Sequence, residues 1–257
     1  MARRRNSNRR RRRGSFGFLY KLLSMLVICG ALIAAITLFF KVNHIEVSGQ
    51  QRYTADEIRI ATGIQIGDNL FLLDKYDVAD GIIEALPYIE KIRINRKLPD
   101  TMLIQVEECS EPLALVQDGS TWLISPKGKI VEQTDEAFAE NYASISGCQL
   151  LAPSVGTKIA LATEYTTKQT SLLELLAALG EAGMLEQLDG LRLDNDKELK
   201  MDYAGRFTVV MPYEADYAYQ LRYLIAILAG GKIQDNMTGT FDMTQEGGKV
   251  NFIQNVR

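Results

Sequence analysis

The feature that most constrains this chain is an uncharged apolar run at residues 22–40, LLSMLVICGALIAAITLFF, between Lys21 and Lys41. As a helix rising about 1.5 Å per residue, this run would span roughly 28 Å, close to the hydrocarbon thickness of a bilayer. The run therefore predicts one transmembrane helix near the N-terminus.

The residues before this run are basic, and they predict how the chain is oriented. Residues 1–21 contain Lys21, no acidic residue, and eight arginines: Arg3, Arg4, Arg5, Arg9, Arg10, Arg11, Arg12 and Arg13. Cytoplasmic flanks of membrane spans collect Lys and Arg. We therefore expect a basic cytoplasmic tail at residues 1–21, a single span at residues 22–40 that contacts the lipid bilayer, and an extracytoplasmic C-terminal part at the cell membrane.

Three other interpretations of the N-terminal region compete with a retained span. A cleaved signal peptide has a shorter apolar stretch, of about 7 to 15 residues, and a cleavage site with small residues. Here the bulky residues 38–40 precede Lys41. A lipoprotein signal needs a small residue before its cysteine, whereas Ile28 precedes Cys29. The arginines could also form a nucleic-acid arm, but beside a span they are better explained by topology and anionic headgroups.

The chain after the basic tail is acidic. It has 29 Lys and Arg against 32 Asp and Glu in total, and removing the nine basic residues of positions 1–21 leaves 20 against 32, a net charge of −12. An anionic surface is a poor fit to a phosphate-rich ligand, so we expect no nucleic-acid partner and interpret the charge as a source of solubility. About 216 residues follow Lys41, enough for two small domains.

The three cysteines carry no disulfide signature. Cys29 lies in the apolar run, which leaves Cys109 and Cys148 outside it. These two could pair in an oxidising compartment, but their separation matches no recognised spacing. We expect both to be small buried apolar residues.

Residues 42–109 have the pattern of one compact α/β unit. Ile45 and Val47 alternate with polar neighbours, as in a short strand. A capping box at residues 54–57 then opens a short helix that Gly63 can end.

A second helix and a hairpin complete this unit. The helix begins at Asp74 or Asp77 and ends at Pro87, and its inward face is apolar: Val78, Ile82, Ile83 and Leu86. Two strands with alternating apolar residues flank a turn at residues 98–100. The predicted order is strand, helix, helix, strand, strand.

Two segments of this unit resemble a known family. VNHIEVSGQQRYTADEIRIATGIQIGDNLFLLD at residues 42–74 and LPYIEKIRINRKLPDTMLIQVEE at residues 86–108 are similar to a POTRA domain of the FtsQ/DivIB cell-division family. The matching features are the strand leading to Gly49, residues 67–71, the Pro87 turn, the hairpin at residues 98–100 and the exit at residues 106–108. They follow a single span with a basic leader, and the resemblance covers nearly the whole chain, being weakest in residues 1–18.

Residues 110–257 fit the second, β-rich domain of that family. Strands are predicted at residues 113–116 and 121–124 around an Asp118-Gly119 turn, and then, after a turn at residues 125–128, at residues 130–131. Further strands are expected at residues 191–193, 199–203 and 207–209, and a terminal hairpin of residues 239–243 and 249–253 around Gly247 and Gly248.

Two helices are expected in this second domain. The first has an apolar stripe of Leu172, Leu175, Leu176 and Leu179 and ends at Gly183. The second runs from about Glu214 to residues 230–231 with Tyr217, Leu221, Leu224, Ile225 and Leu228 inward. The fold class is therefore α+β: one transmembrane helix, an α/β POTRA domain at residues 42–109, and a β-rich domain with helices at residues 110–257.

The sequence contains no recognisable catalytic set. His44 is the only histidine, and Ser-x-x-Lys, Gly-x-Ser-x-Gly and P-loop motifs are absent. Glu107 and Glu108 could serve glycoside hydrolysis, but adjacent strand residues point to opposite faces. Asp194 and Asp196 flank a turn, where Asp is expected for backbone reasons. We expect no catalytic residue, no metal site, no cofactor and no small-molecule substrate.

The resemblance implies a non-catalytic scaffold of the bacterial division machinery. It implies that the exported domains bind and stabilise FtsL-like and FtsB/DivIC-like membrane partners at the septum, with a partner strand docking on the C-terminal strands. The candidate partner-binding residues are Thr244, Gln245, Gly247, Gly248, Val250 and Phe252. The family often has an aromatic residue where this chain has Gln245. Phe252 could be either an apolar anchor for the partner or a part of the core.

Other functions and contacts compete with this prediction. A membrane-anchored POTRA chaperone for exported chains would resemble outer-membrane assembly factors, which carry several POTRA units before a transmembrane β-barrel, whereas one unit is found here. A cell-wall-acting enzyme would need the catalytic set that is missing. Gly30 and Ala34 form a small-x-x-x-small step, which could let the span pack against a partner helix.

Overall fold

The computed structural model describes residues 16–231, 233–234, 236–245 and 249–255, apart from the side chains of Phe16 and Thr163. The chain divides into two compact units. The first contains residues up to 46, residues 65–74 and residues 95–103, and the second contains residues 47–64, 75–94 and the chain from residue 104 onward. The expected domain boundary between residues 109 and 110 stays a prediction.

Helix α1 (Phe16–Phe39) contains most of the apolar run. Its residues 17–39 are long and apolar enough to cross a membrane, and none of them is buried inside the protein. A helix that is apolar and exposed on all sides suits a lipid environment. The helix starts earlier than expected, so that it includes Lys21, and it ends just before Phe40.

The end of α1 is hydrogen-bonded to a loop at residues 65–74. The Asn69 side-chain amide donates to the Ile36 carbonyl at 3.0 Å, and the Leu70 N–H donates to the Phe40 carbonyl at 2.8 Å. The last carbonyls of a helix lack partners within it. Asn69 therefore supplies a hydrogen bond to a group in the last turn of α1.

The residues after α1 are held on both sides. The Val42 N–H donates to the Asp68 carbonyl, and the Gly67 N–H donates to the Val42 carbonyl, each at 2.8 Å. Val42 is fully buried, and the Arg96 guanidinium donates to the Leu70 carbonyl at 2.6 Å. The chain therefore passes from α1 into the folded part of the first unit without a free linker.

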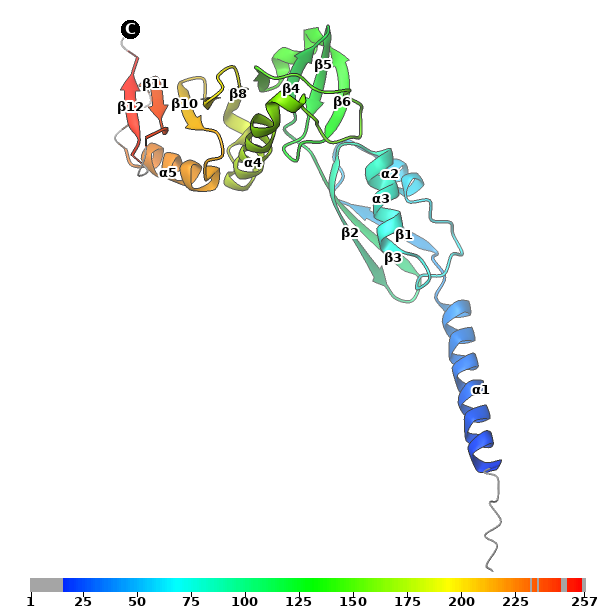
Figure 1. Cartoon of the computed structure of the whole chain (residues 1–257). Helices are drawn as coiled ribbons and strands as arrows, with labels where there is room; N and C mark the ends of the chain where they lie inside the picture. The colour runs from blue at the N-terminus through cyan, green and yellow to red at the C-terminus, as the bar shows by residue number, and fades with distance from the viewer. Residues whose placement is uncertain (1–15, 232, 235, 246–248, 256–257) are drawn as a thin grey trace, which may run out of the picture. The chain divides into compact units, whose positions relative to one another are not determined.

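Three strands form a small sheet in the order β1-β3-β2: β1 (His44–Ser48), β2 (Ile89–Lys97) and β3 (Thr101–Glu108). Between β1 and β2 the chain forms α2 (Ala55–Ala61) and α3 (Lys75–Ala85), which contact each other (Figure 1). The order strand, helix, helix, strand, strand is confirmed. Helix α3 begins directly after Asp74, the first of its two expected starts.

The expected capping box opens α2. The Glu57 N–H donates to the Thr54 hydroxyl at 3.2 Å, and the Thr54 N–H donates to the Glu57 carboxylate at 2.8 Å. The Thr54 N–H and the Thr54 hydroxyl both donate to the Glu57 carboxylate, and these two bonds lower the pKa of Glu57. Gly63 follows the helix with a φ of 66°, as the sequence predicts.

Gly49 lies directly after β1, at a position that no side chain fits. Its φ is 88°, and a Cβ added there would collide with the Val106 carbonyl oxygen of β3. Left-handed backbone is costly for other residues, and here the collision with backbone adds to that cost.

We expect Gly49→Ala to lower the free energy of unfolding of the detergent-solubilised chain by about 3 kcal/mol or more, since strain and overpacking add. Gly63→Ala is the matched control, because Gly63 also has positive φ but open space around its Cβ position. It should lose only about 1 kcal/mol. Chemical unfolding followed by circular dichroism measures both, and equal losses would contradict this account.

Nine strands form the larger sheet, in the order β12-β11-β10-β9-β8-β7-β4-β5-β6. They are β4 (Leu113–Gln117), β5 (Ser120–Ile124), β6 (Ile130–Asp135), β7 (Ser144–Ser146), β8 (Leu188–Arg192), β9 (Glu198–Tyr203), β10 (Phe207–Pro212), β11 (Gly239–Asp242) and β12 (Asn251–Gln254). Asp118 and Gly119 have φ of 52° and 74° and join β4 to β5, as expected. Short 3-10 helices lie at Glu136–Asn141, Thr163–Tyr165 and Leu185–Gln187.

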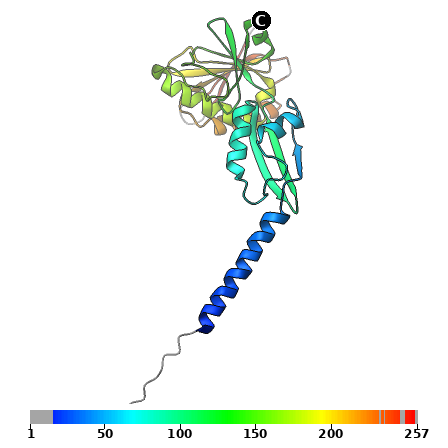
Figure 2. The same cartoon turned by 90° about the vertical axis from the view of Figure 1, so that its right-hand side faces the viewer.

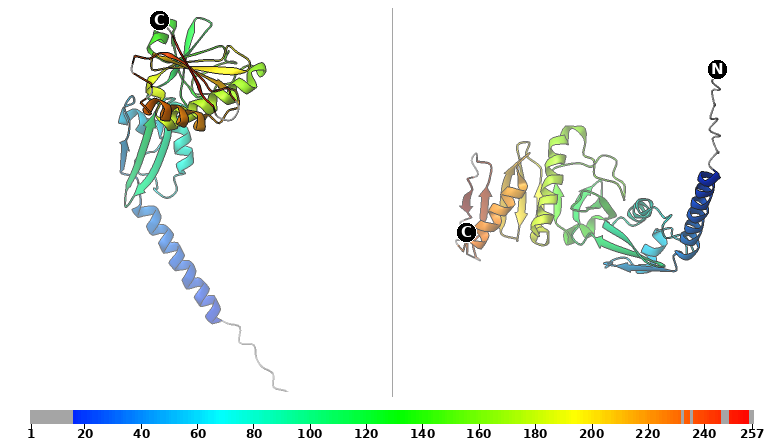
Figure 3. Two further views of the ribbon diagram at one scale, coloured as in Figure 1. Left: turned by 90° about the vertical axis from the view of Figure 1, so that its left-hand side faces the viewer. Right: turned by 90° about the horizontal axis from the view of Figure 1, so that it is seen from below.

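Helices α4 (Thr166–Ala182) and α5 (Tyr217–Ala229) contact each other and lie along the same face of this sheet (Figures 2 and 3). Their buried residues join the main core, among them Leu172, Leu175, Leu176, Leu179, Tyr217, Leu221 and Leu224. Gly183 ends α4 in the left-handed conformation, as expected.

Two predictions for α5 are wrong. The helix begins at Tyr217 rather than near Glu214, because the Asp216 side chain caps it by accepting the Tyr219 N–H at 2.9 Å. Ile225 is exposed rather than inward. Each residue turns a helix by about 100°, which places Ile225 at the margin of the stripe that Leu224 occupies.

A smaller core within the second unit contains Tyr88, Cys109, Ala114, Leu123 and Val131. At Tyr88, a polar cluster adjoins this core. The Tyr88 hydroxyl donates to the Glu132 carboxylate at 2.5 Å, and Arg52 pairs with the same carboxylate at 2.7 Å. The Arg52 guanidinium lies 3.9 Å from the centre of the Tyr88 ring. This cluster joins the end of the small sheet to β6.

Cys109 and Cys148 are both free thiols. Cys109 is buried as expected, whereas Cys148 is only half-buried. Burial raises the pKa of Cys109 to about 12 and that of Cys148 to about 11. Both side chains are therefore protonated at neutral pH.

We expect iodoacetamide at pH 8 to leave both thiols of the folded chain unmodified, because the thiolate is the reactive form and appears only as the pH approaches these raised values. In guanidinium both should be alkylated at least about tenfold faster, since the pKa returns towards 8.5. Peptide mass spectrometry measures the extent. Equal rates with and without denaturant would contradict the burial of these thiols.

Candidate partner-binding site

The candidate site lies at the edge of the nine-stranded sheet formed by β12. This strand pairs antiparallel with β11, with the register Gly239↔Gln254, Thr240↔Ile253, Phe241↔Phe252 and Asp242↔Asn251. Within the described residues, no strand pairs with the other side of β12. An unpaired edge presents a row of open backbone donors and acceptors.

The hydrogen-bond pattern shows which backbone groups of β12 are open. The Asn255 N–H donates to the Thr238 carbonyl at 2.9 Å, so these two residues form a hydrogen-bonded pair just beyond the strands. Bonded and non-bonded pairs alternate along an antiparallel ladder. Ile253 is therefore bonded to β11, and the N–H and C=O groups of Phe252 and Gln254 point away from it.

The Phe252 ring holds β12 against the core. Its centroid lies 4.7 Å from that of Phe241 and 6.3 Å from that of Phe207. Gly239 allows this packing, because a Cβ there would come within 2.8 Å of the Phe252 ring. The structure thus places Phe252 in the core, and its part in partner binding stays a prediction.

The other face of β12 carries an exposed apolar side chain. Successive residues of a strand point to opposite faces, so Ile253 lies on the face opposite Phe252, and it is 60% exposed. Sequence reasoning did not select Ile253 as a candidate.

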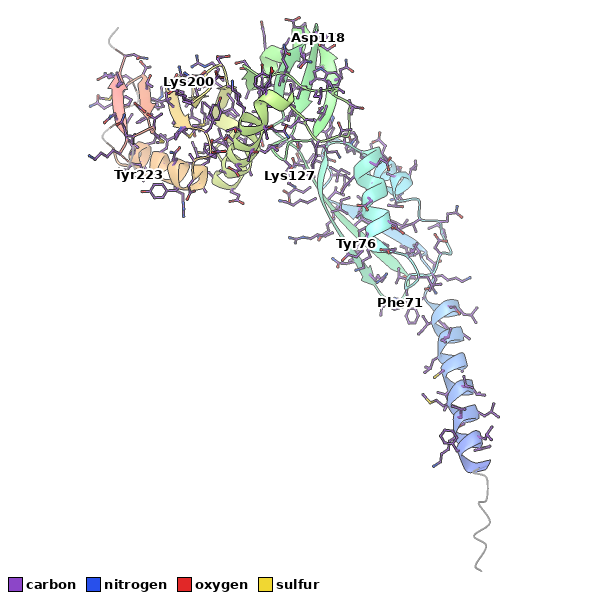
Figure 4. The ribbon with its side chains drawn as sticks, in the orientation of Figure 1. Phe71, Tyr76, Asp118, Lys127, Lys200 and Tyr223 are labelled. Carbon is purple, nitrogen blue, oxygen red and sulfur yellow. The ribbon has the colours of Figure 1, made fainter. Side chains whose placement is uncertain are left out.

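A groove of about 360 Å³ lies beside this edge, between α5 and the chain on either side of residues 246–248. Three of the predicted residues line it, namely Thr244, Gln245 and Val250, together with Tyr219 and Tyr223 of α5. The two tyrosine rings are one helical turn apart and parallel, with centroids 6.4 Å apart (Figure 4, where Tyr223 is labelled). Gly247 and Gly248 lie outside the described residues.

Polar groups shape the floor of the groove. The Thr244 N–H and hydroxyl both donate to the Asp242 carboxylate, at 2.9 and 2.7 Å, and they lower the pKa of Asp242. The Gln220 side-chain amide donates to the Met243 carbonyl at 3.4 Å. In the described part of the chain, the buried side-chain oxygen of Gln220 accepts no hydrogen bond. A buried acceptor of this kind is costly unless a donor reaches it.

Sequence reasoning missed the two groove tyrosines, although a signal was present. Tyr219 and Tyr223 are four residues apart, so they share one face of α5. That face is offset from the one that carries Leu221 and Leu224. An aromatic pair on the outward face of an otherwise well-ordered helix is a pattern that indicates a surface site.

The carboxylates considered for catalysis do not converge. Glu107 pairs with Lys91 at 2.5 Å, whereas Glu108 accepts the N–H groups of Arg52 and Tyr53 at 2.6 and 3.2 Å. This confirms that adjacent strand residues point apart. Over the residues whose positions are described, no group of three or more His, Cys, Asp or Glu could hold a metal ion.

We expect Phe252→Ala to lower the free energy of unfolding by roughly 2 kcal/mol, because it removes a half-buried ring from an aromatic cluster. Ile253→Ala is the matched control and should change stability by less than about 0.5 kcal/mol, since its side chain is exposed. Thermal unfolding of the detergent-solubilised chain measures both. A larger loss for Ile253→Ala would mean that the two faces of β12 have been assigned the wrong way round.

Comparison with known families identifies the first part of the fold. Residues 40–108 match the model of the POTRA domain, FtsQ-type. With one candidate membrane helix before this domain and mixed sheets with helices after it, the chain is an α+β protein that carries a POTRA domain.

Relatives extend the likeness beyond the POTRA domain. The chain is 24% identical to the cell division protein DivIB of Clostridium botulinum (strain Hall) over 217 residues, covering 84% of this chain and 83% of that protein. It is 26% identical to the cell division protein FtsQ of Geotalea daltonii over 200 residues, covering 76% and 69%. It is 28% identical to FtsQ of Corynebacterium glutamicum over 111 residues, covering 42% and 50%. The FtsQ-type POTRA match and the relatives named DivIB and FtsQ support the FtsQ/DivIB family for this chain, and these likenesses support a role in cell division and fit a membrane-anchored septal protein.

Proposed function

We propose that this protein is a non-catalytic, single-pass scaffold of the division machinery that binds FtsL-like and FtsB/DivIC-like membrane proteins at the septum. The observation that carries the proposal is the open backbone edge of β12 beside a groove lined by three of the candidate residues. An extended partner segment can add to such an edge as a further strand.

Two features support an extended partner segment at this edge. Main-chain hydrogen bonds to Phe252 and Gln254 would hold the partner strand in register. The groove would receive side chains from the part of the partner that extends past β12. The parallel tyrosines Tyr219 and Tyr223 offer large, rigid apolar surfaces, and such aromatic residues are enriched in interfaces.

The proposed orientation places residues 1–21 in the cytoplasm and the folded part outside. The eight arginines before α1, and the absence of acidic residues among them, support it. We also propose that residues 42–109 and 110–257 are separate functional domains. The divergent positions of Glu107 and Glu108 argue against a hydrolytic role for this pair.

The experiment that tests partner binding removes one outward donor from the edge. Gln254→Pro eliminates the open N–H of residue 254 without breaking a bond to β11, because proline is tolerated on edge strands. We expect this variant to capture co-expressed FtsB/DivIC-like partner about tenfold or more less well, since an open acceptor in the partner strand loses its donor. Co-purification of the full chain in detergent measures capture.

Gln254→Ala is the matched control, because it shortens the same side chain but keeps the N–H. It should capture the partner as well as the unmodified chain does. Circular dichroism of Gln254→Pro checks that the sheet is intact. Equal capture by both variants would remove β12 from the interface, and loss with both would assign the effect to the Gln254 side chain instead of the backbone.

A further inference from the structure

Four large apolar side chains are exposed at one end of the first unit. Ile66, Phe71 and Leu72 of the loop at residues 65–74 are 67%, 44% and 77% exposed, and Leu98 of the β2–β3 turn is 56% exposed. We call these four residues the collar. Contiguous exposed apolar groups of this kind usually mark an interaction surface.

The collar lies beside the end of α1. The Phe71 ring meets the Phe40 ring edge to face at 5.1 Å, and Figure 4 shows Phe71 next to the end of the helix. The turn that contains Leu98 is joined to the same stretch, because the Asn43 N–H donates to the Asp100 carbonyl at 2.9 Å. Both parts of the collar are thus fixed within a few residues of Phe39.

The position of Phe39 relates the collar to the membrane. Residues 17–39 form the candidate span, and as a helix they cover roughly 34 Å, slightly more than the hydrocarbon core. With α1 across the bilayer, Phe39 and Phe40 at its end would lie at the boundary between acyl chains and headgroups. Side chains that contact Phe40 are within reach of the same boundary.

The charges around the collar nearly balance. Lys97 pairs with Glu46 at 3.2 Å, and the pKa of Asp100 is lowered by the Asn43 side-chain amide, which donates to it at 3.2 Å. The charged residues of the folded part of this unit are Lys41, Arg96 and Lys97 against Glu46, Asp68, Asp74 and Asp100. Such a surface has little electrostatic preference for anionic lipid, so apolar contact must dominate.

We propose that the collar inserts into the headgroup–acyl boundary of the leaflet in which α1 ends, so that the membrane is contacted by folded loops as well as by the span. This inference rests on α1 crossing the bilayer, as in the proposed function. Interfacial apolar faces typically lie about 5–10 Å into this boundary, a depth that the exposed side chains of Leu72 and Leu98 can reach. The hydrogen bonds of Asn69 to α1 and of Leu70 to Phe40 hold the loop that carries Leu72. The bond between Asn43 and Asp100 holds the turn that carries Leu98.

Quenching by lipids brominated on their acyl chains tests the insertion. The full chain, carrying Trp122→Phe to remove its single tryptophan, is reconstituted in phosphatidylcholine vesicles with Leu72→Trp or Leu98→Trp as reporter. We expect a blue-shifted emission and roughly half or more of the quenching seen with Phe39→Trp, since all three side chains share one boundary. Ile60→Trp on α2, where Ile60 is 80% exposed, is the aqueous control.

The possible outcomes distinguish a failure of the collar proposal from a failure of the proposed membrane anchor. Quenching at position 39 but aqueous behaviour at positions 72 and 98, equal to Ile60→Trp, would overturn the collar and leave that surface to a protein partner. Absence of quenching at position 39 would overturn both the collar and the membrane anchor of the proposed function.

A second pair of variants tests whether apolar contact drives the insertion. With Leu98→Trp as reporter, Leu72→Ser should reduce quenching by about half, because it removes a major apolar group from the collar. Ile60→Ser removes a comparably exposed apolar group that is not part of the collar and should change nothing. Quenching that is unaffected by Leu72→Ser but rises several-fold when anionic lipid is added would overturn the apolar mechanism.

Discussion

The hydrogen bonds between the end of α1 and the loop at residues 65–74 are the constraint on which the membrane-proximal half of this structure depends. Asn69 satisfies a carbonyl of the last helical turn, and its neighbour Leu70 bonds the residue that follows the helix. A span that ended in a flexible linker would leave the folded part free to turn relative to the bilayer. Here the direction of the helix axis is transmitted to the loops of the first unit, so their exposed apolar side chains keep a fixed position relative to α1.

Near the C-terminal end of the described chain, side-chain packing holds β12 in position. A four-residue strand that pairs with one neighbour has few hydrogen bonds to hold it. The Phe252 ring compensates by packing against the tilted Phe241 ring and close to Gly239, where a larger residue would not fit. Because the side chain secures the strand, the backbone on its outer side is left available. The Phe252 ring therefore packs on the core while its backbone groups stay open, and a role of the ring as a partner anchor stays a prediction.

The elements that sequence predicts well are those that short segments determine. The apolar run, the Thr54–Glu57 capping box and the Asp118-Gly119 turn each carry their cause within a few residues, and all are present in the structure. Strand β7 has only three residues, and it exists because β4 and β8 pair with it from distant parts of the chain. The parallel pairing of β11 with β10 and the groove beside it likewise depend on how α5 crosses over the sheet. No local sequence pattern encodes these contacts. The sequence could therefore place the candidate residues on the terminal strands, but it could not show which of them lie at the sheet edge, in the groove or in the core.

This division of roles within the candidate site bears on specificity. Backbone groups at Phe252 and Gln254 are the same in any sequence, so pairing at the edge supplies affinity without selecting among extended partners. Selection then requires side chains that differ between proteins. In this chain the side chains next to the edge are those of the groove, above all the parallel Tyr219 and Tyr223 and the buried amide oxygen of Gln220. An aromatic surface accepts many apolar groups, and the buried oxygen of Gln220 already accepts no hydrogen bond in the described part of the chain, so a partner that brings no donor loses no hydrogen bond there. For a partner strand docked as proposed, selection would therefore depend on how well its side chains fit the aromatic surface of Tyr219 and Tyr223.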